Sequence, residues 1–280
     1  MEIVTFRKSL KINESFNVYS LGDIHEGNCN HHAEALKQAV KIIREDPNGY
    51  WIGMGDYIDA ITHDDKKRFN PITISEKYKL SDLKDLPVKQ MEFVFDAINS
   101  IQSKCIALLC GNHEESYTKN NSNDVYERFT EMFASSAWGS VPPKRLGYVG
   151  CIRYTIEKAN TVTHFVNHGN GVGGLSAGYP VTKLWQMSMP FEFDVFWMAH
   201  IHQLIEDDRK IISISNRGQL HKKRKFVGCT GSFLETYNEG HANYFEHKGR
   251  GEGDIGMLRL NIKLNRKCEI ILSQEKIKLG

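Results

Sequence analysis

The chain has 280 residues, of which 40% are hydrophobic and 25% are charged, and its formal net charge is +2. These values are close to those of soluble globular proteins, and they exclude a chain that is disordered over most of its length. So small a net charge gives no reason to expect wholesale binding to nucleic acid or to a membrane surface. The length fits one large α/β domain, and we expect a single domain over residues 1–280.

Several features are typical of a cytoplasmic protein. The opening residues, MEIVTFRKSL, lack the apolar core of a signal peptide, and no apolar run approaches the roughly 20 residues needed to cross a bilayer. The 6 cysteines are scattered, form no CxxC pair and stand partly in apolar runs, so we expect buried thiols. The sequence therefore predicts a cytoplasmic protein without a membrane segment.

The first half of the chain alternates predicted strands with amphipathic helices. Three apolar runs lead to a glycine and a polar residue: Val18–Leu21, Tyr50–Met54 and Ile106–Cys110. Apolar residues at helical spacing follow the first two runs. Leu36 and Ile43 lie on one face of the first predicted helix, and Met91 and Ile98 lie on one face of the second. This alternation predicts a largely parallel sheet, in which the loops at the carboxyl ends of the strands meet at one edge.

The second half is richer in predicted strands. These are Ile152–Ile156, Thr163–Val166, Val195–Met198, Met257–Lys263 and Cys268–Leu272. The last two flank Asn265-Arg266-Lys267, a sequence typical of a hairpin turn, and the region from about 203 to 280 is expected to be strand-rich. The predicted fold class is α/β, with two packed mixed β-sheets flanked by helices. A polar, lysine-rich stretch at about 61–87 is longer than a usual connection and is expected to be an insertion at the edge of the site.

Five short polar motifs each follow an apolar run. They are Asp23-Ile24-His25, Gly55-Asp56-Tyr57-Ile58-Asp59, Gly111-Asn112-His113-Glu114, Asn167-His168-Gly169 and Ala199-His200-Ile201-His202. Each alone has an ordinary explanation, such as a turn, a helix cap or a buried core histidine. Together, their carboxylate, imidazole and amide groups are typical ligands of divalent ions such as Mn, Fe, Zn or Mg. They fit a structural zinc site less well.

The order and spacing of these motifs resemble the calcineurin-like metallophosphoesterase superfamily. One position departs from the usual pattern, because Ala199 stands where glycine is common, but this removes no ligand. The resemblance implies two divalent metal ions, with Mn favoured and Fe, Zn, Mg or Ni as alternatives. It assigns one metal to Asp23, His25 and His202, the other to Asn112, His168 and His200, and places Asp56 between them as a bridge.

The same resemblance implies hydrolysis of a phosphate ester by a hydroxide that bridges the two ions. The two ions would outweigh the negative charges of Asp23, Asp56 and the hydroxide, so the site would keep a positive charge for an anionic phosphate. His113 would donate a proton to the leaving group or hydrogen bond to the phosphoryl group, and Asp59 would orient His113. An ordinary solvated loop carboxylate is the alternative interpretation of Asp59.

The substrate is less well defined. The Ser/Thr phosphatase branch has an arginine directly after the second aspartate, whereas Ala60 and Ile61 follow Asp59 here, so a phosphodiester is favoured over a monoester. Two basic clusters, Lys66–Arg68 and Lys222–Lys225, leave a nuclease open, although both are also typical of solvated surface segments. A phosphomonoesterase, a nucleic-acid-binding protein and a non-catalytic scaffold are further alternatives. The sequence does not indicate the oligomeric state.

Overall fold

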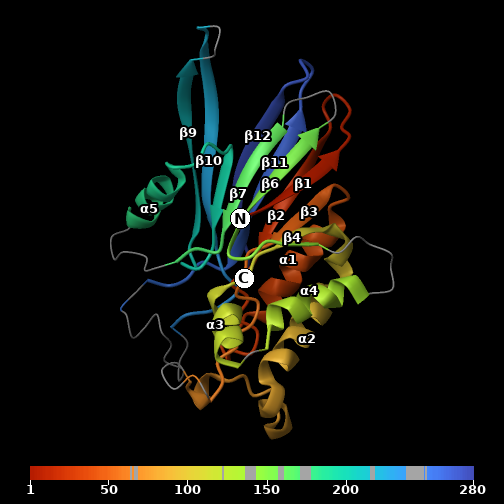
Figure 1. The fold of residues 1–280 in the computed structure, drawn as a ribbon, viewed down its shortest axis with the longest axis vertical. Helices are drawn as coiled ribbons and strands as arrows, with labels where there is room; N and C mark the ends of the chain where they lie inside the picture. Colours follow the sequence, from red (N-terminus) through yellow and green to blue (C-terminus); the bar gives the residue numbers. More distant parts are fainter. Residues whose placement is uncertain are drawn as a thin grey trace.

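The computed structural model describes residues 1–63, 65, 69–121, 123–135, 143–156, 161–170, 178–214, 218–237, 249 and 251–280. Two six-stranded sheets pack face to face, with helices on their outer sides (Figure 1). In spatial order, sheet A contains β1 (Glu2–Lys8), β6 (Val149–Ile156), β7 (Thr161–Asn167), β8 (Val195–Met198), β10 (Leu220–Thr230) and β9 (Leu204–Ile214). Sheet B contains β12 (Ile270–Lys278), β11 (Gly256–Leu264), β2 (Ser15–Leu21), β3 (Gly49–Gly53), β4 (Cys105–Leu108) and β5 (Lys144–Arg145). The predicted pair of mixed sheets is confirmed.

Three hydrophobic clusters hold these layers together. The first lies between the sheets and includes Phe16 and Leu258 of sheet B and Trp197 of sheet A, all buried. The second joins the outer side of sheet B to three helices: α1 (Ala33–Glu45), α2 (Leu86–Ile98) and α4 (Val125–Ser135). The third packs α5 (Tyr179–Ser188) on the outer side of sheet A through Leu184 and Phe196. Both sheets therefore have an apolar face on each side over much of their area.

Helix α1 illustrates how the sequence produces this packing. Its buried residues are Ala35, Leu36, Ala39, Val40 and Ile43, and they recur at the spacing of one helix face. The side chain of His32 accepts a hydrogen bond from the backbone N–H of Ala35 at 3.2 Å and thereby caps the first turn. The helix therefore begins at a defined point after the first polar motif.

The predicted insertion at about 61–87 contains two 3-10 helices, η1 (Pro71–Thr73) and η2 (Leu80–Asp85), and its last two residues start α2. It returns to the loop after β2, because Ser75 donates its backbone N–H to the carbonyl of Gly27 at 2.9 Å. A third 3-10 helix, η3 (Asn99–Lys104), connects α2 to β4. Among the described residues, no helix combines the length and the apolar character that crossing a bilayer requires.

The structure corrects several details of the predicted elements. The strand β1 was not predicted, because only Val4 of its side chains is buried. The second strand of the terminal hairpin begins at Ile270 and continues to Lys278, beyond the predicted end at Leu272. Its turn is as expected, since the side chain of Asn265 accepts hydrogen bonds from two backbone N–H groups of the loop. Cys151 and Cys229 are buried as expected, but Cys29, Cys105 and Cys110 are only half-buried, and the expectation of a buried thiol is wrong for Cys268, which is exposed in this turn.

The topology brings the polar motifs together. Strands β2, β3 and β4 are parallel neighbours in sheet B, and β7 and β8 are parallel neighbours in sheet A. One of the five motifs begins at or within three residues of the end of each of these strands, and Asn112 is the first residue of α3 (Asn112–Asn121). Because parallel strands share one carboxyl edge, the loops of the two facing sheets converge on a single site.

Candidate metal centre

All seven predicted ligands lie in one buried or half-buried cluster at the carboxyl ends of the five strands. They form two groups of side chains. Asp23, His25 and His202 make the first group, and Asp56, His168 and His200 make the second, with ligand-type atoms in each group no more than 4.8 Å apart. Asn112 joins the second group, because its side-chain oxygen lies 3.0 Å from Nε2 of His168.

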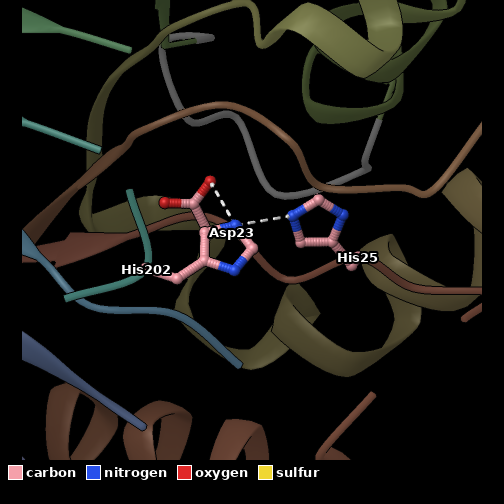
Figure 2. A group of neighbouring side chains, drawn as sticks. All are labelled: Asp23, His25 and His202. Carbon is pink, nitrogen blue, oxygen red and sulfur yellow. Dashed lines mark hydrogen bonds and ion pairs between the residues drawn. The ribbon is translucent and has the colours of Figure 1, made fainter. Parts of the chain in front are cut away.

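The first group joins the two sheets (Figure 2). The Nε2 atoms of His25, after β2, and His202, after β8, lie 3.1 Å apart, and Oδ1 of Asp23 lies 3.6 Å from Nε2 of His202. Nitrogen atoms that bind one ion at about 2.1 Å are themselves roughly 3 Å apart. Within the described chain, Oδ1 of Asp23 has no hydrogen-bond partner. The three side chains therefore fit a shared cation.

The second group is centred on Asp56. Its Oδ2 lies 3.2 Å from Nε2 of His168 and 3.9 Å from Nε2 of His25, which belongs to the first group. Its Oδ1 accepts the backbone N–H of His113 at 2.9 Å. The opposite ring nitrogen of His168, Nδ1, lies 2.8 Å from the carbonyl of Met54, to which it can donate, and this leaves Nε2 to act as a ligand. Asp56 thus stands between the two groups.

The buried carboxylates have opposite pKa shifts. Burial raises the pKa of Asp23 well above its ordinary value, and the nearby Asp56 raises it further, although His168 opposes the shift. Burial acts in the same direction on Asp56, but the imidazoles of His168 and His113 outweigh it and hold the pKa of Asp56 well below its ordinary value. Without a metal, Asp56 therefore stays ionised near pH 7.

The pKa values of the nearby imidazole groups are also shifted in opposite directions. Burial alone would lower the pKa of His168, but Asp56 and Asp23 raise it to about 10. Burial, with the positive charge of His168, lowers the pKa of His200 to about 4. Burial, together with the neighbouring His25, holds the pKa of His202 well below its ordinary value. His200 and His202 are therefore neutral near pH 7, which is the form that binds metal ions.

The backbone at the ligands is unusual. Asp23, His25, Asp56, His200 and His202 all have positive φ values, between 47° and 71°. Left-handed backbone is uncommon outside glycine and costs of order 1–3 kcal/mol per residue, so it persists only where the surroundings enforce it. Here the loops after β2 and β3 are joined by hydrogen bonds from Asp23, Ile24 and His25 to the carbonyls of Gly55 and Asp56. Ala199 does not have a positive φ, which explains why alanine is tolerated there.

Two glycines leave room for Asp56. Gly55 has a φ of +88°, and a Cβ atom at this position would lie 2.7 Å from Nδ1 of His168. A Cβ atom on Gly111 would lie 2.1 Å from both the backbone nitrogen and Oδ1 of Asp56. Glycine is therefore needed at Gly111 because of close approach and at Gly55 also because of its backbone conformation.

His113 lies beside the first group, with its ring centroid 4.8 Å from that of His25. Its Nδ1 lies 2.5 Å from the backbone carbonyl of Asp59 and 3.7 Å from Oδ1 of the same residue. That Oδ1 also lies 3.5 Å from Nδ1 of His25. The closest contact that Asp59 makes with His113 is therefore through its carbonyl, whereas its carboxylate lies between the two imidazoles. Asp59 is buried, so it is not a solvated loop carboxylate.

Sequence reasoning missed the role of Glu114. This residue is fully buried, and its carboxylate accepts hydrogen bonds from four backbone N–H groups, three of them in the loop that carries Asp56. Burial raises its pKa, and Asp56 contributes to the same shift. The available signal was its place at the end of the Gly-Asn-His-Glu motif. A carboxylate that is buried beside ligands needs hydrogen-bond partners inside the protein, which suggests a structural role.

Glu26 was also missed. It follows His25, is buried and binds the inserted segment, because Tyr78 donates its hydroxyl to Oε1 at 2.6 Å and Nζ of Lys77 lies 2.5 Å from the same atom. Oε2 lies 3.5 Å from Nε2 of His31. The insertion is therefore attached to the loop that carries two predicted ligands. This attachment agrees with its expected position at the edge of the site.

The second basic cluster, Lys222–Lys225, lies within β10. Lys225 is buried, and its Nζ donates to the carbonyls of Ser188 and Phe191 at 2.6 and 2.8 Å. Lys223 pairs with Asp194 at 2.7 Å, and Arg224 pairs with Asp208 at 3.1 Å. Three of its four charges thus have partners within the protein. Lys66–Arg68 lies outside the described residues.

Comparison with solved structures finds matches of low sequence identity. A predicted phosphoesterase from Streptococcus pneumoniae TIGR4 is 8% identical with a TM-score of 0.33, and the match covers 94% of this chain and 99% of that chain. Vps29 from Chaetomium thermophilum is 10% identical with a TM-score of 0.38, covering 95% and 97%. GAP50, described as the anchor in the inner membrane complex of Plasmodium, is 10% identical with a TM-score of 0.41, covering 95% and 89%.

The sequence itself matches a protein family. No curated protein matches the chain significantly. The model of the calcineurin-like phosphoesterase family matches residues 16–228, a range that begins in β2, ends in β10 and includes all five polar motifs. The chain therefore belongs to the calcineurin-like phosphoesterase family.

Proposed function

We propose that this protein is a hydrolase that uses two divalent metal ions to cleave phosphate esters, and that it prefers phosphodiesters. The observation that carries the proposal is the position of Asp56, whose Oδ2 lies 3.2 Å from a ligand-type nitrogen of one group and 3.9 Å from one of the other. A carboxylate in that position can join two cations. Two separate structural sites would not need this shared residue.

The two groups differ little in chemistry. Asp23, His25 and His202 would hold one ion, and Asn112, His168 and His200 would hold the other, with Asp56 shared. The two ions would activate the attacking water and offset the negative charge that develops on the phosphoryl oxygens. Mn, Fe, Zn, Mg and Ni all accept this mixture of imidazole, carboxylate and amide ligands, and Mn is our first choice.

His113 is proposed to give a proton to the leaving oxygen. Its Nδ1 lies 2.5 Å from the carbonyl of Asp59, and a carbonyl can only accept, so Nδ1 carries a proton. In the neutral ring Nε2 then has no proton to give. His113 can therefore act as an acid only as an imidazolium, and Oδ1 of Asp59 lies 3.7 Å from its Nδ1.

The preference for a diester is supported by the position after Asp59. Ala60 stands there, is 4% exposed and donates its backbone N–H to Gln90 at 3.0 Å. Alanine at this position cannot provide the guanidinium that grips the doubly charged phosphate of a monoester in the Ser/Thr phosphatase branch. A diester carries one charge fewer on phosphorus and depends less on such a cation.

A rate comparison tests the proposal. We expect the protein with added Mn to hydrolyse bis-p-nitrophenyl phosphate faster than p-nitrophenyl phosphate, and we expect Asp56→Asn to abolish both activities. A strong preference for the monoester would overturn the diester assignment. Linear single-stranded and double-stranded DNA belong in the same comparison, because a nuclease would use the same ligands. A wild-type protein that binds Mn but cleaves none of these substrates would favour a non-catalytic scaffold.

A further inference from the structure

The loop from Asp56 to Ile58 carries the shared carboxylate, but its own conformation is unfavourable. Asp56 has a φ of 50°, which an L-residue adopts only when neighbouring groups hold it there. The loop follows Gly55 directly, and its backbone is surrounded by protein, since Asp56, Tyr57 and Ile58 are all at most 1% exposed. Its N–H groups must therefore find partners inside the protein.

Glu114 provides those partners. Its Oε1 accepts the N–H groups of Tyr57 at 2.7 Å and Ile58 at 3.2 Å, and its Oε2 accepts the N–H groups of Asp56 at 3.0 Å and Gly111 at 2.9 Å. All four partners are donors, so only a group with two accepting oxygens fits. A glutamine at this position would turn its NH₂ group toward at least one N–H.

The first turn of α3 begins with a predicted ligand and contacts the Asp56 loop through the next two residues. Asn112 is a predicted ligand, His113 donates its backbone N–H to Oδ1 of Asp56 at 2.9 Å, and Glu114 holds the loop backbone. The helix and the loop are more than 50 residues apart in sequence, with separations of 56 to 58 for the Glu114 bonds to the loop. One of the four bonds, to Gly111, caps the start of the helix itself.

We propose that Glu114 is the positioning residue that holds Asp56 between the two groups of ligands. It acts through the backbone of residues 56–58 and touches neither a substrate nor a metal in this role. The chemical consequence of this role, the placement of a shared metal ligand, rests on the proposed two-metal function. The structural part of this role, that Glu114 fixes the Asp56 loop, stands independently of that function.

Three variants separate this role from a general effect on the helix. Glu114→Gln keeps the size of the side chain and loses one accepting oxygen. Glu114→Asp keeps the charge but is shorter by one methylene, so it cannot reach all four N–H groups. Glu115→Gln is the matched control, because Glu115 is the next residue of the same helix, and its carboxylate is exposed and, among the described residues, pairs with Lys119 at 3.0 Å.

The first measurement is hydrogen exchange of the metal-free proteins, read on peptides that contain residues 54–58. We expect this segment to exchange about tenfold faster or more in Glu114→Gln than in the wild type. The acceleration should be smaller but visible in Glu114→Asp and absent in Glu115→Gln. Equal protection in Glu114→Gln and the wild type would overturn the proposal. If Glu114→Gln does not fold, Glu114→Asp against Glu115→Gln decides the same question.

The second measurement is the binding of Mn. Loss of an outer hydrogen bond to a ligand typically weakens metal affinity by about 10- to 100-fold, so we expect Glu114→Gln to bind Mn that much more weakly than the wild type. The electron paramagnetic resonance spectrum should also lose the signature of two coupled Mn ions, which Glu115→Gln should keep. A coupled pair of unchanged affinity in Glu114→Gln would contradict the positioning role while leaving the proposed function intact. A wild type that binds no Mn would contradict the proposed function, and hydrogen exchange would still decide the role of Glu114.

Discussion

The Nε2 atoms of His25 and His202 lie 3.1 Å apart, although the two residues are 177 positions apart in sequence. His25 follows β2 of sheet B, and His202 follows β8 of sheet A. Two imidazole nitrogens approach this closely when one donates to the other or when both face a shared cation. The contact therefore joins the two sheets at the point where the proposed chemistry takes place.

Metal binding is expected to release protons. In the metal-free protein, Asp56 and Asp23 raise the pKa of His168 to about 10, so His168 is protonated near pH 7, and it must lose this proton to bind a metal. We expect the release of about one proton or more on Mn binding, and an affinity that decreases as the pH falls. Calorimetry in two buffers of different ionisation enthalpy measures the number of protons released. Identical enthalpies in both buffers would contradict the expectation.

Substitution of His113 should affect poor leaving groups most. His113→Ala removes the proposed proton donor, and general acid catalysis typically contributes roughly 10²- to 10⁴-fold to the rate. We expect the loss to grow along a series of aryl phosphodiesters as the leaving phenol becomes more basic. The amount of bound Mn in the same preparation is the control, because His113 is not a predicted ligand. An equal loss along the whole series would indicate instead that His113 binds the phosphoryl group.

Substitution of Gly111 should disturb the site through contact alone. In Gly111→Ala, the new methyl group would meet the backbone nitrogen and Oδ1 of Asp56 at 2.1 Å, so Asp56 must move. We expect weaker Mn binding and a loss of about 1–3 kcal/mol in the free energy of unfolding, measured by urea denaturation. Gly178→Ala is the matched control, since a methyl group there meets no atom within 4 Å. Similar behaviour of the two variants would show that the Asp56 loop is not tightly held.

Much of this site could be predicted because each ligand follows a short apolar run, and parallel strands bring such positions together. Glu114 could not be assigned in this way, since its partners are backbone N–H groups that depend on the folded loop. Strand β1 has a single buried side chain, so its hydrophobic pattern is too weak to detect. The Lys222–Lys225 segment is polar because most of its side chains are exposed or ion-paired, and only its pairing with β9 shows that it is a strand.

His164 should make stability depend on pH. It is fully buried between the sheets, 3.1 Å from the hydroxyl of Tyr154, and burial lowers its pKa to about 3. The unfolded chain takes up a proton below about pH 6.5 while the folded chain does not, so stability falls as the pH falls from about 6.5 to about 3.

Between about pH 7 and pH 5 the expected loss is about 2 kcal/mol, which urea denaturation can measure. His164→Leu should lose this part of the pH dependence, whereas His63→Gln, at an exposed position, should keep it. The same pH dependence in His164→Leu and the wild type would contradict the assignment.

The number of Mn ions bound per folded chain tests the central claim most directly, with wild type, Asp56→Asn and the exposed control Asp96→Asn dialysed side by side. We expect about two ions in the wild type and in Asp96→Asn, weaker binding in Asp56→Asn, and a rise in melting temperature of roughly 5–10 °C when Mn is present at about 100 times its dissociation constant. A well-folded wild-type protein that binds no divalent metal would contradict the account.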